Sequence, residues 1–123
     1  MTGITREEAI KHHRKMWSWI ASETLSRGYP VSKQNALAHF GWGHLVASCW
    51  MCELNGGVCM DGTACALRWP GGRCAYQNGN RAGLYTRWLD AHDRGSSGRI
   101  MAAILAKRTA ELPEKEEPNN AAL

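Results

Sequence analysis

All five cysteines of this 123-residue chain fall between Cys49 and Cys74, and the rest of the sequence has none. Cys49 and Cys52 are separated by two residues, a gap that lets two thiolates reach one metal ion from a tight turn. Glycines precede several of the cysteines and permit the sharp turns that a chain folded around an ion requires. The stretch therefore predicts a loop region organised by zinc, the metal that such thiolate clusters typically hold.

A structural zinc ion takes four thiolate or imidazole ligands, so five cysteines leave one spare. The spacing allows Cys49 and Cys52 to bind one structural zinc ion together with Cys65 and Cys74, or together with Cys59 and Cys65. The first set closes a longer loop, and the second keeps the ligands local. The gaps between the cysteines do not choose between the two sets.

Other interpretations of the cysteine cluster are disulfides and reactive thiols, and His44 is a further possible ligand. Charged residues interrupt the start of the chain, which argues against a signal peptide. No stretch reaches the roughly 20 apolar residues of a membrane span. We therefore expect no membrane association and a cytoplasmic location, where clustered thiols bind metal more often than they pair.

Hydrophobic periodicity predicts a mostly α-helical, single small domain, with about three helices flanking the Cys-rich, zinc-stapled loop region. These three helices are expected at residues 6–26, 83–93 and 98–112. Shorter helices are expected over residues 32–40 and within residues 45–54. Between them we expect loops and turns around the metal, with no strand longer than a few residues.

Local signals support the helix at each end of the predicted domain. Thr5 and Glu8 form a T-x-x-E capping box, which satisfies free backbone amides at a helix start. The last helix groups four residues on one side, which are Ile100, Ala103, Ile104 and Lys107. Pro113 is expected to end this helix.

The chain has six tryptophans, and their positions predict three different environments. Two lie on apolar helix faces and are expected in the core, Trp17 and Trp88. Two lie in the cysteine segment and are expected to flank the metal, Trp50 and Trp69. For the remaining pair, Trp19 and Trp42, core packing competes with exposed roles in base stacking or protein contact.

The charge distribution divides the chain into a basic body and an acidic tail. Residues 1–112 are expected to form the zinc-stabilised helical domain, and residues 113–123 a disordered acidic tail. A basic body permits contact with nucleic acid, although ordinary solubility charge is the preferred explanation for a body this weakly basic. The candidate nucleic-acid contacts are four arginines in and after the cysteine segment: Arg68, Arg73, Arg81 and Arg87.

The sequence offers no catalytic signature. It has no H-E-x-x-H, G-x-S-x-G, phosphate-binding or G-x-G-x-x-G motif. His12 and His13 are adjacent, so they point to different sides of a helix and do not chelate one ion together. Cysteines committed to zinc are poor nucleophiles. We therefore expect a protein that is not an enzyme.

The order of these features resembles a family of small, largely uncharacterised proteins from phages and prophages of Gram-positive bacteria. The resemblance extends over about residues 5–110. The first matching motifs are an E-A-I-x-x-H-R-x-M-W-x-W-I-like helix at residues 8–20 and a C-x-x-C-E motif at residues 49–53. Later cysteines around a tryptophan follow, at Cys59, Cys65, Trp69 and Cys74, and then G-L-Y-x-x-W at residues 83–88. The gap between Cys59 and Cys65 is longer than in the family pattern, which leaves Cys65 the better supported ligand of the two.

The resemblance implies a phage-derived, cytoplasmic protein of a bacterial host cell with a Cys-rich zinc site, but it supplies no activity. A small, non-catalytic, zinc-stapled phage protein is expected to act by contact. Our leading hypothesis is therefore an interaction protein that binds and inhibits a host protein or a host defence complex, as anti-CRISPR proteins do. The alternative is a small zinc-containing protein that binds nucleic acid through its basic face.

Overall fold

The computed structural model describes residues 4–43, 50–51, 65–70, 77–78 and 81–115. Within these ranges the chain is mostly α-helical, as predicted, with four α-helices: the three main ones expected and the short one expected over residues 32–40. In chain order the elements are α1 (Arg6–Arg27), α2 (Lys33–Phe40), β1 (Gln77–Asn78), β2 (Arg81–Ala82), α4 (Leu84–Asp93), the 3-10 turn η3 (Gly95–Gly98) and α5 (Arg99–Ala110). Trp50 and Met51, which lie within the helix expected at residues 45–54, also have helical backbone.

Helix α1 begins and ends where local chemistry dictates. The Thr5 side chain accepts a hydrogen bond from the Glu8 backbone amide, and the Glu8 side chain accepts one from the Thr5 amide, so the predicted capping box is confirmed. Glu7 and Glu8 also place negative charge at the positive end of the helix dipole. At the other end, Gly28 adopts a left-handed conformation with φ 79° and donates its amide to the Thr24 carbonyl.

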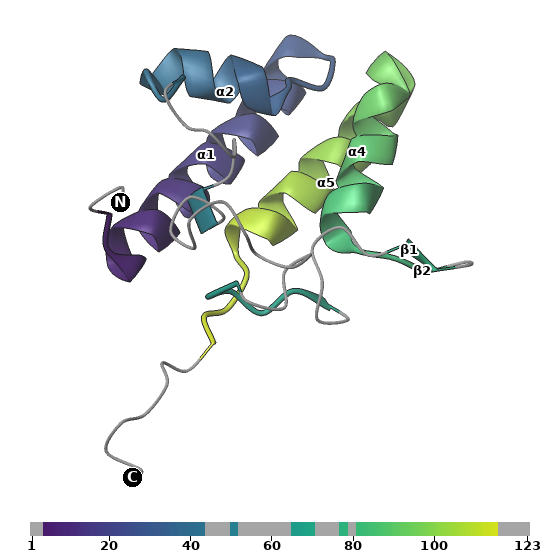
Figure 1. Ribbon diagram of the computed structural model, residues 1–123. Coiled ribbons are helices and arrows are strands. Elements are labelled where there is room, and N and C mark those ends of the chain that lie inside the picture. Colours follow the sequence, from purple (N-terminus) through teal and green to yellow (C-terminus); the bar gives the residue numbers. More distant parts are fainter. Residues whose placement is uncertain (1–3, 44–49, 52–64, 71–76, 79–80, 116–123) are drawn as a thin grey trace, which may run out of the picture.

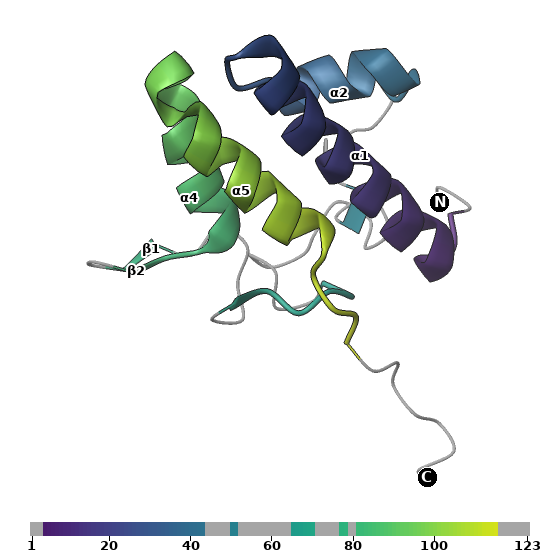
Figure 2. The same ribbon diagram turned by 180° about the vertical axis from the view of Figure 1, so that it is seen from behind.

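Helices α1 and α5 lie side by side and form the centre of the molecule (Figure 1). Helix α4 packs against α5, and α2 packs against α1, so the two central helices each carry a neighbour. Viewed from behind, α1 and α5 are nearest the viewer (Figure 2). The core lies between these helices and includes Trp17 and Trp88, the two tryptophans that were expected there.

The buried side of α5 is made chiefly of small residues. Its buried positions are Ala102, Ala103, Leu105, Ala106, Thr109 and Ala110. Short side chains let the backbones of α1 and α5 approach closely. The larger residues that the sequence grouped on one side, such as Ile100 and Ile104, are exposed instead. Helix α5 therefore buries mainly small residues and exposes larger ones, both apolar and charged.

Gly98 sets the distance between α4 and α5. A Cβ atom added at this position would lie 2.1 Å from the Ala91 carbonyl oxygen in α4. Glycine is the residue that permits this approach of one backbone to another. The turn η3 thereby reverses the chain tightly enough for α4 and α5 to pack as neighbours.

The described part of the chain after α5 pairs with residues near Cys65. The Arg68 amide donates to the Pro113 carbonyl at 2.8 Å, and the Lys115 amide donates to the Ala66 carbonyl at 2.8 Å. Arg6 at the start of α1 donates to the Glu114 side chain. Backbone pairing among the described residues thus extends to Lys115.

The remaining pairing is a short antiparallel hairpin. Gln77 pairs with Ala82 and Asn78 with Arg81, in line with the expectation of strands of a few residues at most. Among the described residues, no helix combines the length and the apolar character needed to cross a membrane.

Candidate functional site

Cys65 is the one predicted metal ligand that lies within the described residues, and its sulfur is held by two N–H groups. The Leu67 backbone amide donates to Cys65 Sγ at 3.4 Å, and the Trp69 indole Nε1–H donates to the same sulfur at 3.3 Å. The Cys65 side chain is buried, with 3% of its surface exposed. Two donors aimed at one buried sulfur are arranged for a thiolate, because a neutral thiol is a weak acceptor.

This donor set fits a zinc ligand. Backbone amides two residues after a cysteine commonly point at a metal-bound sulfur, and a buried negative charge needs a positive partner, which Zn²⁺ would supply. Within the described ranges, no three potential ligands gather in one place. The other predicted ligands lie outside these ranges, namely Cys49, Cys52, Cys59 and Cys74. His44 lies outside them as well.

A chain of contacts connects the Cys65 sulfur to the α1–α5 interface. The Trp69 ring, which donates to the sulfur, meets the His13 ring edge-on with ring centroids 6.1 Å apart. His13 lies on α1, and its Nε2 is 2.9 Å from the Thr109 carbonyl oxygen of α5. Because a carbonyl can only accept, Nε2 carries the proton. Residues 65–69 are thus packed directly against the contact that joins the two central helices.

Burial controls the chemistry of His13. Desolvation lowers its pKa from 6.5 to about 4, although the hydrogen bond to the Thr109 carbonyl acts in the opposite direction. The ring is therefore neutral near pH 7, and its Nδ1 has no hydrogen-bond partner among the described residues. His13 serves as a neutral donor that ties α1 to α5.

A ring cluster joins α2 to α1. Trp19 stacks on His39 with centroids 4.6 Å apart, and Phe40 stacks on Trp42 at 4.5 Å. His12 contacts Trp42 at 4.8 Å, and burial lowers the His12 pKa. Two cationic side chains also lie over rings of this cluster, with Lys15 over Phe40 and Arg27 over Trp19. The half-buried Trp19 and Trp42 therefore use their ring contacts within the protein, which favours the packing interpretation over base stacking.

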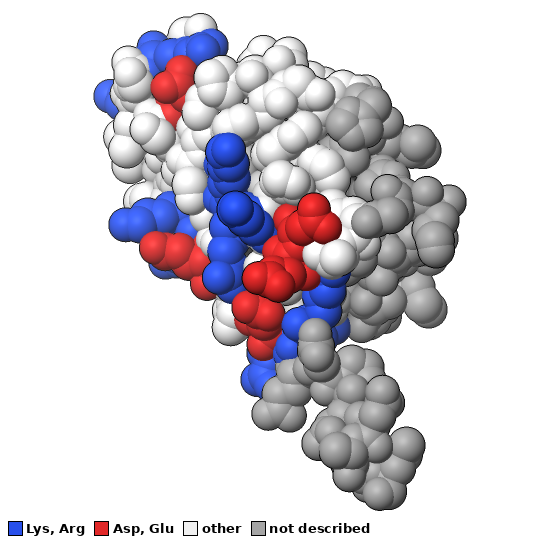
Figure 3. Space-filling model, turned by 90° about the vertical axis from the view of Figure 1, so that its left-hand side faces the viewer, with Lys and Arg blue, Asp and Glu red and all other residues white. Residues whose placement is uncertain are grey.

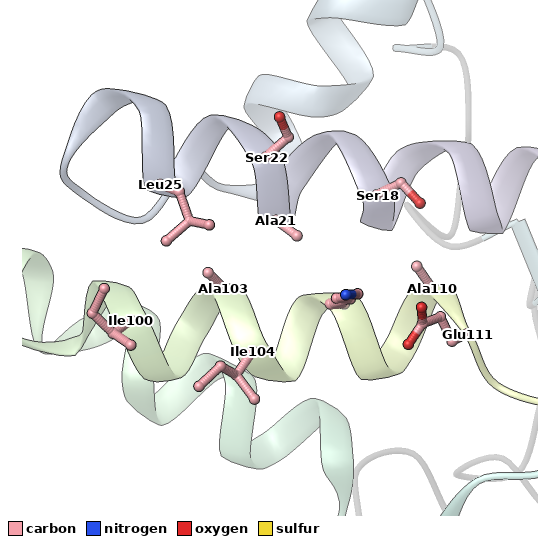
Figure 4. Close-up of a pocket in the computed structure, with 10 residues that line it drawn as sticks. Ser18, Ala21, Ser22, Leu25, Ile100, Ala103, Ile104, Ala110 and Glu111 are labelled. Atoms are coloured by element: carbon pink, nitrogen blue, oxygen red, sulfur yellow. The ribbon is translucent and has the colours of Figure 1, made fainter.

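An elongated apolar groove lies between α1 and α5 and is here called the α1–α5 groove (Figure 4). Its volume is about 570 Å³. Helix α1 contributes Ser18, Ala21, Ser22 and Leu25, and α5 with the residue after it contributes Ile100, Ala103, Ile104, Lys107, Ala110 and Glu111. The alanines form a shallow floor, and the larger side chains stand beside it.

One half of the α1–α5 groove is apolar, and the lining of the other half includes Lys107 and Glu111 among smaller side chains. Leu25, Ile100 and Ile104 have 52%, 50% and 43% of their surface exposed. They cluster at the end of the groove near the start of α5. Lys107 lies one turn further along α5, and Arg108 follows Ile104 by four residues. Both cations are exposed.

The face shown in Figure 3 carries both basic and acidic side chains. Basic and acidic side chains alternate on it, without a continuous basic surface. Ion pairs among the described residues include Arg6 with Glu114 at 3.2 Å and Arg27 with Glu23 at 3.0 Å. Such exposed pairs neutralise charge locally and contribute little to stability.

The structure describes the side chains of two of the four arginines that were predicted to contact nucleic acid. Arg68 and Arg87 have exposed side chains. Arg81 lies in β2, where the backbone alone is described, and Arg73 lies outside the described residues. On α4, Asp90 follows Arg87 by three residues, so its negative charge offsets the arginine on the same helix.

Sequence reasoning missed two parts of this site. The α1–α5 groove was not foreseen, although the sequence had grouped four of its lining residues on one side of α5: Ile100, Ala103, Ile104 and Lys107. The available signal was the number of alanines in α5, which suits a close helix contact. The bond from Trp69 to Cys65 was foreseen only as proximity of the two side chains.

Comparison of the chain with protein-family models, curated proteins and solved structures found no match.

Proposed function

We propose that this protein is a zinc-stabilised interaction protein that binds another protein in the α1–α5 groove and inhibits it. Following the resemblance to phage and prophage proteins, the target is a host protein or a host defence complex in the bacterial cytoplasm, and the role is anti-CRISPR-like. The observation that carries the proposal is the exposure of Leu25, Ile100 and Ile104 around one groove.

Exposed apolar side chains scattered singly need no explanation, but a contiguous cluster around a groove marks an interaction site. The walls of the α1–α5 groove are two helices joined along their length, including the His13–Thr109 bond. A preformed groove loses little conformational entropy on binding, so more of the contact energy appears as affinity. This geometry suits an inhibitor that acts by occupying a partner's surface.

Zinc has a structural role in this proposal. Cys65 is one ligand, and three further ligands come from Cys49, Cys52, Cys59 and Cys74. When bound, the ion closes the loop region and adds folding free energy. The ordered loop region is connected to the helices of the groove, because Trp69 contacts both the Cys65 sulfur and the His13 ring.

The function is tested by expressing the protein in a bacterial strain that is immune to a phage through a CRISPR–Cas system. We expect the wild-type protein to restore plaque formation by orders of magnitude. Ile104→Asp, which places a charge in the apolar half of the groove, should abolish this rescue. Leu89→Asp is the matched control, because Leu89 is an exposed leucine on α4 that does not line the groove.

Circular dichroism and zinc content establish that both variants are folded. If the wild-type protein restores no plaques in strains carrying different defence systems, inhibition of defence is wrong. Rescue that persists in Ile104→Asp would place the inhibitory surface elsewhere. Turnover of a nucleic acid or nucleotide by the purified protein would overturn the non-enzymatic proposal.

Nucleic-acid binding through the basic face is the second candidate, and the exposure of Arg68 and Arg87 favours it. It predicts an affinity for DNA or RNA that falls steeply as salt rises, because phosphate contacts release counterions. The Arg68→Ala and Arg87→Ala variants should each reduce the slope of that dependence. Binding that is absent or independent of salt would remove this candidate.

A further inference from the structure

We propose that the occupant of the α1–α5 groove is an acidic amphipathic helix of the partner protein. This inference rests on the proposed function and specifies the chemistry of the segment that binds. It follows from three properties of the groove: its shape, the order of its apolar and charged residues along α5, and the sign of the charge.

The shape fits one helix. Helices α1 and α5 run antiparallel along the groove, so that Leu25 lies near Ile100 and Ser18 near Ala110 (Figure 4). From Ile100 to Glu111 the α5 wall extends over about 16 Å at 1.5 Å per residue, which is roughly three helical turns. A third helix laid between two others places its large side chains over the alanine floor, as in other helix-in-groove complexes.

The order of residues along α5 specifies the pattern of that helix. Leu25, Ile100 and Ile104 surround the apolar half, which accepts large apolar anchors at positions i and i+3 or i+4 of the partner. Lys107 and Arg108 follow within one turn, about 5 Å further along the axis. The partner's charged residues are therefore expected one to two turns from its apolar anchors.

The sign of the charge is positive. Helix α5 carries Arg99, Lys107 and Arg108 and no acidic residue within its bounds. Arg14 of α1 lies one turn before Ser18, but it pairs with Glu114 at 3.9 Å, so its charge is offset. The positive charge beside the groove therefore comes from α5 itself. Glu111 is the acidic residue of the lining, at the extreme end. Carboxylates on the partner would complement this end of the groove.

A second copy of this chain does not supply the same complement. Two copies paired along the full groove with parallel α5 helices would place Lys107 and Arg108 beside their own counterparts. With antiparallel α5 helices, the cations of one copy would lie beside the apolar half of the other. Both arrangements leave positive charge unpaired in a contact, which is unfavourable.

The test uses the full-length, zinc-loaded protein and three fluorescent peptides of roughly 15 residues, each stapled because isolated helices of this length are marginal. The acidic peptide carries leucines at i and i+4 with glutamates one to two turns beyond. The second peptide has lysines in place of those glutamates, and the third keeps the glutamates but has serines in place of the leucines. Binding is measured by fluorescence anisotropy at low salt.

We expect the acidic peptide to bind at least tenfold more tightly than either of the other two. Ile104→Asp should weaken it at least tenfold, and the double variant Lys107→Glu, Arg108→Glu should reverse the preference toward the lysine peptide. All three substituted side chains are exposed, so the fold is retained. Leu89→Asp should leave the affinities unchanged.

Equal or tighter binding of the lysine peptide to the wild-type protein would overturn the acidic assignment while leaving a groove that binds helices. If no peptide binds and sedimentation shows a dimer that Ile104→Asp dissociates, a second copy is the occupant and the inference is wrong. If no peptide binds a monomeric protein, the inference is also wrong. The plaque assay then decides the proposed function separately, because it does not depend on these peptides.

Discussion

Individual side-chain N–H groups hold the Cys65 segment and the helices next to it in place. The Trp69 indole differs from other aromatic side chains in carrying one N–H group, and that group is directed at the Cys65 sulfur at 3.3 Å. The His13 imidazole likewise presents one N–H to the Thr109 carbonyl. Each interaction can be removed by a substitution that keeps the shape of the side chain, which makes the roles of these residues separable.

Trp69→Phe removes the indole N–H and retains an aromatic ring. We expect the affinity for zinc to fall about tenfold, because groups that donate to a metal ligand typically tune affinity by that factor or more. Competition with a chromophoric chelator measures the change. Trp88→Phe is the matched control, since the indole nitrogen of this buried tryptophan has no hydrogen-bond partner within the described residues. Equal zinc affinities of the two variants would contradict the role assigned to Trp69.

His13 makes stability depend on pH. The unfolded side chain takes up a proton near its ordinary pKa of 6.5, whereas the folded side chain does so near pH 4. Stability is therefore fully present above pH 6.5 and is lost as pH falls toward 4, because the unfolded state binds more protons in that interval. From pH 7 to pH 5 the contribution of His13 to the loss is about 2 kcal/mol.

The matched variant is His13→Gln, whose side-chain amide can donate to Thr109 but does not titrate. Urea unfolding at pH 7 and pH 5 should show that the wild-type protein loses about 2 kcal/mol more stability than the variant over this interval. Loss of zinc at low pH acts on both proteins and cancels in the comparison. Parallel losses in the two proteins would show that His13 does not titrate as its burial implies.

At the scale of elements, local sequence signals predicted where the helices lie, but not which helix faces pack against one another. The capping box at Thr5 and the glycine at position 28 place the ends of α1 within a residue of the prediction. Which side of α5 would be buried depends on how closely α1 can approach, a property of the pair. The alanines of α5 favour close contact over burial of larger side chains, so Ile100 and Ile104 remain outside.

The candidate site divides in the same way. A cysteine cluster in the sequence predicts zinc from composition and spacing alone, and Cys65 has surroundings that suit this role. The choice among the other ligands depends on how residues distant along the chain meet. The groove depends on two helices at opposite ends of the sequence, and the alanines of α5 indicate a close helix contact without identifying its partner.

The small-residue side of α5 gives a prediction about packing. Ala106 is fully buried in the core, so Ala106→Met should overfill the packing around α5 and destabilise the protein by about 1–3 kcal/mol. Ile104→Met, on the exposed side of the same helix, should change stability by less than about 0.5 kcal/mol. Guanidinium unfolding compares the two. Similar effects would mean that α1 and α5 separate easily.

At the scale of the whole molecule, the two ends of the described chain meet. Arg6 in the first turn of α1 donates to the Glu114 side chain and to the Lys115 carbonyl. The bridge between Leu67 and Glu114 fastens the same segment to the residues after Cys65. The described chain after α5 is therefore fixed both to the start of α1 and to the residues after Cys65.

This arrangement has a consequence for the speed of folding. The central interface joins α1 to α5, as in the His13–Thr109 bond, whose residues are 96 positions apart in sequence. Folding must close that long loop before the contact becomes favourable, so the protein should fold slowly for a helical domain. A circularly permuted chain that links residue 115 to residue 4 and opens at Tyr29 would make α1 and α5 successive helices. It would keep the same contacts and shorten the search for the most important one.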